Sequence, residues 1–168
     1  MNWHCLSEEE TERLWRRVNR AVKWKPGSIF ASIKPPKPFQ VFDVSQGFNS
    51  IGFLEDAEMQ ILKAFQSCTL KQESMYALDW QHECYLFNPH APIDKDEFGE
   101  WLVSVIPNGD YCFFIHQDFQ WGLLGDPRQQ TITVFSSPLI RAIERNAPVL
   151  FKSEDRLRMN LMLLLEEE

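Results

Sequence analysis

The spacing of apolar residues predicts a helix near the start of the chain. Ser7 and Glu10 stand before the apolar stripe with the spacing of a capping box, and Pro26-Gly27 ends the pattern. The stripe itself recurs at helical intervals and contains Leu14, Trp15, Val18, Ala21 and Val22. A second stripe predicts a helix from about Asp56 to Cys68. Its apolar face contains Leu54, Ala57, Ile61, Ala64, Phe65 and Cys68.

Between Met75 and Phe135 the apolar period shortens to two residues, which predicts four or five strands. Asn108-Gly109 stands between apolar runs at 101–106 and 111–116, and Asn-Gly is a strong hairpin signal. We therefore expect these two runs to pair. The other strands are expected at 39–44, 119–124 and 131–135.

The last part of the chain is expected to return to helix. Ser137 caps a third helix with Pro138 at its first position. A fourth helix is expected after Pro148, and its leucine stripe would join two copies of the protein. Helices, then strands, then helices predict a single α+β domain over residues 1–148. In this domain the helices at both ends pack on an antiparallel meander of about five strands, and residues 149–168 are a helical extension.

The segment 77–90 is unusually rich in reactive side chains. Treated as one long strand, it places Trp80, His82 and Cys84 on a core face and Asp79 and Glu83 on a wetter face. A bulge or turn near residues 81–83 would break this strand, and the pattern leaves that alternative open.

These residues offer three candidate chemistries: a metal site, a thiol nucleophile and a pair of carboxylates. Imidazole and thiolate are zinc ligands, but His82, Cys84, His90 and His116 match no familiar zinc spacing. A thiol paired with an imidazole lacks any local signature, and thiols among large rings are inert. Two carboxylates four residues apart on a strand are about 13 Å apart, too far to act on one bond. We expect no catalytic residue, no metal and no cofactor.

A binding surface is a less demanding hypothesis, because Trp and Tyr are favoured at interfaces. The residues proposed for it are Trp80, His82, Glu83, His116, Gln117, Asp118 and Trp121. The alternative is a small-ligand protein or enzyme that uses a cluster of His82, Cys84 and His116.

Composition changes the picture in three ways. The formal net charge of −7 disfavours nucleic acid and anionic membranes, and it would attract a basic protein partner. The four cysteines form no compact framework and no signal peptide precedes them, which favours the cytoplasm. The apolar run at 161–165 is too short to span a membrane.

Three motifs carry a resemblance to a known family. They are the segments 76–85, 107–111 and 121–127, the last followed by the strand at 131–135. Together they resemble a family of uncharacterised bacterial proteins, the DUF2716 domain of unknown function, over about Ser7 to Asn146. The resemblance implies a bacterial cytosolic protein of one domain and supplies no activity or site residue. A small, acidic, aromatic-rich protein of this class resembles immunity proteins that neutralise toxins, so we expect a non-enzymatic interaction domain.

Overall fold

A computed structural model describes residues 1–25, 33–45 and 52–151. Its centre is an antiparallel sheet in which the described residues form strands in the order β1-β4-β3-β5-β6-β7-β2. This confirms the α+β class and the antiparallel sheet, with seven strands where about five were expected. The strands are β1 (His4–Cys5), β2 (Phe39–Asp43), β3 (Met75–Asp79), β4 (Tyr85–Phe87), β5 (Cys112–His116), β6 (Gly122–Asp126) and β7 (Thr131–Phe135).

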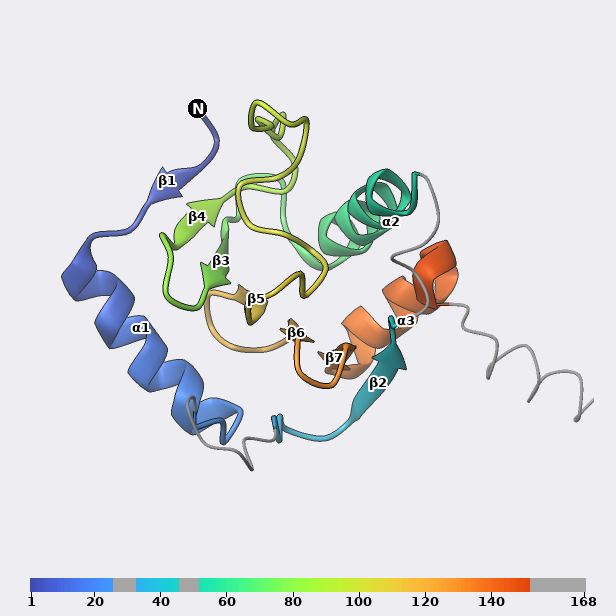
Figure 1. Ribbon diagram of the computed structural model, residues 1–168, viewed down its shortest axis with the longest axis horizontal. Helices are drawn as coiled ribbons and strands as arrows, with labels where there is room; N and C mark the ends of the chain where they lie inside the picture. Colours follow the sequence, from blue (N-terminus) through green and yellow to red (C-terminus); the bar gives the residue numbers. More distant parts are fainter. Residues whose placement is uncertain (26–32, 46–51, 152–168) are drawn as a thin grey trace, which may run out of the picture.

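Helices cover both faces of the sheet (Figure 1). Helix α1 (Glu8–Ala21) lies on one face, while α2 (Phe53–Cys68) and α3 (Ser137–Arg145) lie side by side on the other. A short 3-10 helix, η2 (Val149–Phe151), follows α3. Because strand side chains alternate between faces, β5 sends Phe113 and Ile115 toward α1 and Phe114 toward α2. The sheet therefore separates two apolar cores.

The helices follow from the sequence signals. The Ser7 hydroxyl accepts the Glu10 backbone N–H at 3.2 Å, and the Glu10 carboxylate accepts the Ser7 N–H at 2.9 Å, which confirms the capping box. Helix α2 buries Ala57, Ile61 and Phe65 of its expected face. Helix α3 begins at Ser137 as a helical residue, so its N-cap is Ser136, one residue before the predicted cap.

The segment 77–90 follows the alternative that its pattern left open, because a turn at residues 80–82 ends β3 after Asp79 and folds the chain into the β3–β4 hairpin. The prediction of a strand at 101–106 is wrong, and Asn108-Gly109 lies in a bend. Trp101, Val103 and Val105 are nevertheless buried, so their alternation comes from packing in an irregular loop. The two-residue strand β1 gave no recognisable pattern.

The end of the chain is described only to Phe151. Leu150 and Phe151 are buried, and the Phe151 ring stacks on Phe42 with centroids 4.6 Å apart. The core therefore continues past the predicted boundary at residue 148. The expected helix with its leucine stripe and the helix stop at Pro26-Gly27 lie outside the described residues.

Candidate functional site

The turn between β3 and β4 gathers one group of the predicted residues. Gln81 adopts a positive φ of 75°, and the chain reverses so that His82 stands over the end of β3. The His82 Nδ1 atom lies 3.0 Å from Asp79 Oδ1 and 3.2 Å from Asp110 Oδ2. Asp110 lies two residues before the start of β5, so the three side chains come from two adjacent strand ends. We call Asp79, His82 and Asp110 the carboxylate–imidazole triad.

The imidazole of the triad is attracted to both carboxylates, whereas the two carboxylates repel each other. A hydrogen bond from the imidazole to Asp79, with attraction to that carboxylate and to Asp110, raises the pKa of His82. Burial raises the pKa of Asp79, and the contact with His82 opposes this shift. The ligand atoms all lie within 4.8 Å of one another, which is compact enough for one divalent cation. It is the one such group among the described residues.

A pocket of about 540 Å³ adjoins the triad. It lies between α1 and the β3–β4 turn, and His82 and Gln81 form part of its wall. The apolar part of the wall consists of Trp15, Trp24 and Trp80, of which Trp24 is fully buried. The Trp24 and Trp80 rings meet edge to face with centroids 5.9 Å apart. Trp80 is therefore partly core and partly pocket wall.

Glu83 lies in the same turn but outside the triad. Its carboxylate is exposed and accepts a hydrogen bond from the Tyr85 hydroxyl at 2.8 Å. Burial and the adjacent Glu83 charge raise the pKa of Tyr85. The contact fixes the start of β4.

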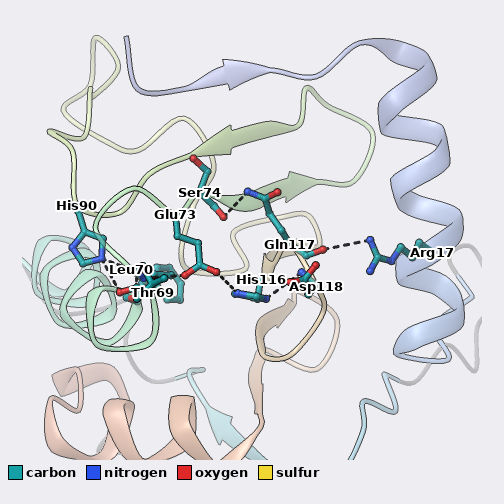
Figure 2. A network of polar contacts seen from close by, with 10 residues as sticks. Arg17, Thr69, Leu70, Glu73, Ser74, His90, His116, Gln117 and Asp118 are labelled. Carbon is teal, nitrogen blue, oxygen red and sulfur yellow. Dashed lines mark hydrogen bonds and ion pairs between the residues drawn. The ribbon is translucent and has the colours of Figure 1, made fainter.

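The remaining predicted residues form a second group, in the turn between β5 and β6 (Figure 2). His116 is 5% exposed and its Nε2 atom contacts Glu73 Oε1 at 2.5 Å. The Nδ1 atom accepts the Asp118 backbone N–H at 3.1 Å, so Nε2 is the donor to Glu73. The Gln117 side chain donates to the Ser74 carbonyl at 2.9 Å.

This second group ties structural elements together. The backbone carbonyl of Gln117 accepts from Arg17 of α1 at 3.3 Å, while Glu73 belongs to the loop after α2. The Leu70 backbone N–H, assisted by His116, lowers the pKa of Glu73. Trp121 is buried and stacks on Phe65 with centroids 5.6 Å apart. These contacts join the ends of the central strands to α1 and to the loop after α2, and Trp121 belongs to the core.

The two groups stand at opposite ends of the central strands. The register pairs Met75 with His116 and Asp79 with Cys112, so His116 and the triad are separated by the length of β3, about 13 Å. Cys84 is buried on the α1 side, and burial raises the pKa of its thiol. The predicted cluster of His82, Cys84 and His116 therefore does not form. The proposed binding residues divide into two separate groups, and His116 and Trp121 of the second group are buried.

The sequence interpretation missed a third feature, the loop Asp94–Glu100, which we call the acidic hairpin. Lys95 pairs with Trp101 as an antiparallel bridge, and the Asp96 N–H donates to the Glu100 carbonyl at 2.8 Å. At the tip Gly99 takes a φ of 76°, and Phe98 is 79% exposed. Four carboxylates within seven residues, around one phenylalanine and one glycine, are the sequence signal that could have identified it.

The comparisons with known proteins agree with one another. The family model described as "Protein of unknown function (DUF2716)" matches residues 5–140, most of the chain. The chain belongs to the DUF2716 family. It is also 53% identical over 161 residues to the uncharacterized protein YxiI of Bacillus subtilis (strain 168), covering 92% of this chain and 99% of that protein. No solved structure matches the chain.

The match to DUF2716 includes all three features described above, because the triad, the second group and the acidic hairpin fall within residues 5–140. That range contains helices α1 and α2 and six of the seven strands. The remaining strand, β1, begins one residue before it. Among the described residues, no helix is both long and apolar enough to cross a membrane.

Proposed function

We propose that this DUF2716 protein is a non-enzymatic interaction domain that binds a basic protein partner through the acidic hairpin. The observation that carries the proposal is the exposure of Phe98 on a firmly held loop rich in carboxylates. A large aromatic ring that is 79% exposed is an unusual use of apolar surface. Rings of this kind, surrounded by polar groups, are typical anchors of protein interfaces.

The hairpin is held in shape before any partner arrives. Asp96 Oδ1 accepts the backbone N–H groups of Phe98 and Glu100 at 2.9 and 3.0 Å. At its base, Glu58 of α2 accepts the Trp101 N–H at 3.0 Å and pairs with Lys95 at 3.3 Å. Because these contacts fix the backbone, binding would cost little ordering of the loop.

The charge of the hairpin selects the partner. Asp94, Glu97 and Glu100 are exposed, and the one cation of the loop, Lys95, is already paired with Glu58. The net charge of −7 adds to this local field. A basic protein surface would be steered toward the hairpin and would place an apolar contact on Phe98.

Toxins that act on nucleic acids or other anions carry basic surfaces, and a protein that covers such a surface would block it. An immunity-type role is therefore the form of this function that the acidic hairpin supports best. It follows from charge complementarity together with the resemblance in class between small acidic domains and immunity proteins.

The first test is capture of the tagged protein's partner from native cells at low salt, followed by measurement with purified proteins. We expect Phe98→Ala to raise the Kd by about ten-fold or more, chiefly through faster dissociation. Raising salt from about 0.01 M to about 1 M shortens the Debye length from about 30 to about 3 Å. The association rate should then fall by about ten-fold or more.

Phe39→Ala is the matched control, because Phe39 is also an exposed phenylalanine, 41% accessible, but lies on the edge strand β2. It should leave the Kd unchanged. A captured partner that binds the Phe98→Ala protein as tightly as the unaltered one, or whose association ignores salt, would contradict the proposal.

A further inference from the structure

We infer that the carboxylate–imidazole triad is a binding site for one divalent cation of the first transition series, such as Zn²⁺ or Mn²⁺. The ion would be held by one imidazole nitrogen and two carboxylate oxygens. The sequence led us to expect no metal because the histidines and cysteines have no familiar zinc spacing, but that reasoning left out Asp79 and Asp110. The site is separate from the acidic hairpin and does not rest on the proposed function.

The distances within the triad fit neighbouring ligands of one metal ion. Nδ1 of His82 lies 3.0 Å from Asp79 Oδ1 and 3.2 Å from Asp110 Oδ2. Bonds from a metal to nitrogen and oxygen are about 2.1 Å long, so two ligands about 90° apart are about 3.0 Å from each other. A cation could therefore be bound by all three atoms with little movement of the side chains.

The charges of the triad leave one carboxylate without a partner of its own. In the metal-free protein a single imidazolium faces both Asp79 and Asp110. In the part of the chain that the structure describes, neither carboxylate forms an ion pair with a lysine or an arginine. A divalent cation that displaces the Nδ1 proton would neutralise both carboxylates, so its charge matches the site.

Backbone hydrogen bonds orient the ligands before a cation arrives. Asp110 Oδ1 accepts the Tyr111 N–H at 2.8 Å, which leaves Oδ2 beside His82. The Trp80 N–H donates to the Tyr111 carbonyl at 3.0 Å and joins the end of β3 to the start of β5. The His82 N–H donates to the Asp79 carbonyl at 3.3 Å and closes the turn. Ligands oriented by such contacts bind a metal more tightly.

All three ligand side chains can be reached from the solvent. The His82 side chain is 67% exposed, while those of Asp79 and Asp110 are 20% and 17% exposed. Partial burial of the two carboxylates strengthens their attraction for a cation, because less water screens it. Three protein ligands also leave positions on the ion for water or for a group of a bound molecule.

The ligand set selects the class of cation. Imidazole suits zinc, iron and nickel, whereas carboxylate oxygen also suits manganese. Mg²⁺ and Ca²⁺ prefer oxygen ligands alone, so the imidazole of His82 disfavours them. We therefore expect Zn²⁺ to bind more tightly than Mn²⁺, and Mg²⁺ to bind more weakly than either.

The test is calorimetric titration of the full-length protein with ZnCl₂ near neutral pH, after EDTA treatment and dialysis into metal-free buffer. We expect one site with a Kd of about 100 µM or below, and MgCl₂ should bind at least about ten-fold more weakly. His82→Gln and Asp110→Asn should each raise the Kd of Zn²⁺ by about ten-fold or more. Asp110→Asn keeps an oxygen that can accept the Tyr111 N–H, so it removes the charge and preserves the loop.

Cys5→Ser and Glu97→Gln are the matched controls. Cys5 is an exposed thiol and Glu97 is an exposed carboxylate of the acidic hairpin, so both could attract zinc without a built site. Neither change should alter the Kd.

Mn²⁺ locates the ion, because it broadens the NMR signals of nearby nuclei. Small amounts should broaden the amide signal of Tyr111, which is bonded to Asp110, before that of Gly99 at the tip of the acidic hairpin.

Four results would overturn the inference. One is a Kd for Zn²⁺ above about 100 µM. Another is an unchanged Kd in either His82→Gln or Asp110→Asn, which would mean an adventitious ion only. The third is broadening of the Gly99 signal before that of Tyr111. The fourth is Mg²⁺ binding as tightly as Zn²⁺.

Discussion

At the scale of single residues, the sequence placed side chains on the correct faces more often than it placed them beside the correct partners. Alternation put Trp80 and Cys84 on one face, and both lie on the α1 side. The predicted faces are correct on both strands of the β3–β4 hairpin. The register pairs Ala77 with Tyr85, so odd-numbered residues of both strands share one face and even-numbered residues share the other. The contact of His82 with Asp110 could not be predicted, since it joins residues on different strand ends.

The triad makes stability depend on pH. The pKa of His82 is raised in the folded protein, so its contribution is fully present below the ordinary histidine pKa of about 6.5. That contribution is lost as the pH rises through the raised value. Because His82 is exposed, we expect no more than about 1 kcal/mol.

Urea unfolding of the native protein and of His82→Gln at several pH values measures this effect. The native protein should be the more stable below about pH 6, with the difference shrinking as the solution becomes alkaline. His4→Gln, an exposed histidine in β1, serves as control. A difference that grows toward high pH would refute the assignment of charge to the triad.

Gly122 is a position where only the smallest residue fits. It pairs with Phe135 across β6 and β7, and an added Cβ would lie 2.5 Å from the Phe135 ring. We expect Gly122→Ala to lower the free energy of unfolding by about 1–3 kcal/mol. Phe135→Leu in the same chain should recover part of that loss, as measured by a double-mutant cycle. Strict additivity would show that the two side chains do not collide.

At the scale of elements, the sequence predicted those helices and strands whose signals lie within a few residues. It did not predict structure that depends on contacts between residues far apart in the chain. The capping box of α1 and the β-branched run of β7 act within a few residues, and both elements formed as expected. The prediction of a strand at 101–106 was wrong because an irregular loop that buries every second side chain has the same apolar alternation as a strand. The loop 88–111 is held instead by long-range contacts, such as that of Asn2 with the Asn88 carbonyl at 2.8 Å.

Glu58 of α2 is the anchor of the acidic hairpin. It is 4% exposed, and burial raises its pKa while the Trp101 N–H and Lys95 oppose the shift. Glu58→Ala leaves the Trp101 N–H unpaired, so we expect a loss of about 1–3 kcal/mol in the free energy of unfolding. Hydrogen exchange at Trp101 should also become faster.

Two further variants test whether the loss of stability in Glu58→Ala comes from the contact with Trp101. Glu58→Gln keeps an acceptor for Trp101 and should cost less than Glu58→Ala. Glu55→Ala, at an exposed position of the same helix, should change stability by no more than about 0.5 kcal/mol. Equal losses for all three would mean that α2, and not the hairpin contact, is being disturbed.

At the scale of the whole molecule, the sheet separates the tryptophan-lined pocket from the acidic hairpin. The tryptophan-lined pocket adjoins α1, and the acidic hairpin is anchored on α2. These two helices lie on opposite faces of the sheet (Figure 1). The apolar cores on the two faces of the sheet are separate. The central strands β5 and β6 lie between these cores and are buried on both faces.

The strand order also fixes when the sheet can be completed. Its two outer strands, β1 and β2, come from the first quarter of the chain and pair with residues 85–86 and 131–135. On the ribosome, the nascent chain therefore carries two unmatched strands while the intervening residues are translated. Only when β7 emerges can β2 be covered. Chaperones that recognise extended apolar segments would meet this protein in that interval, before its fold exists.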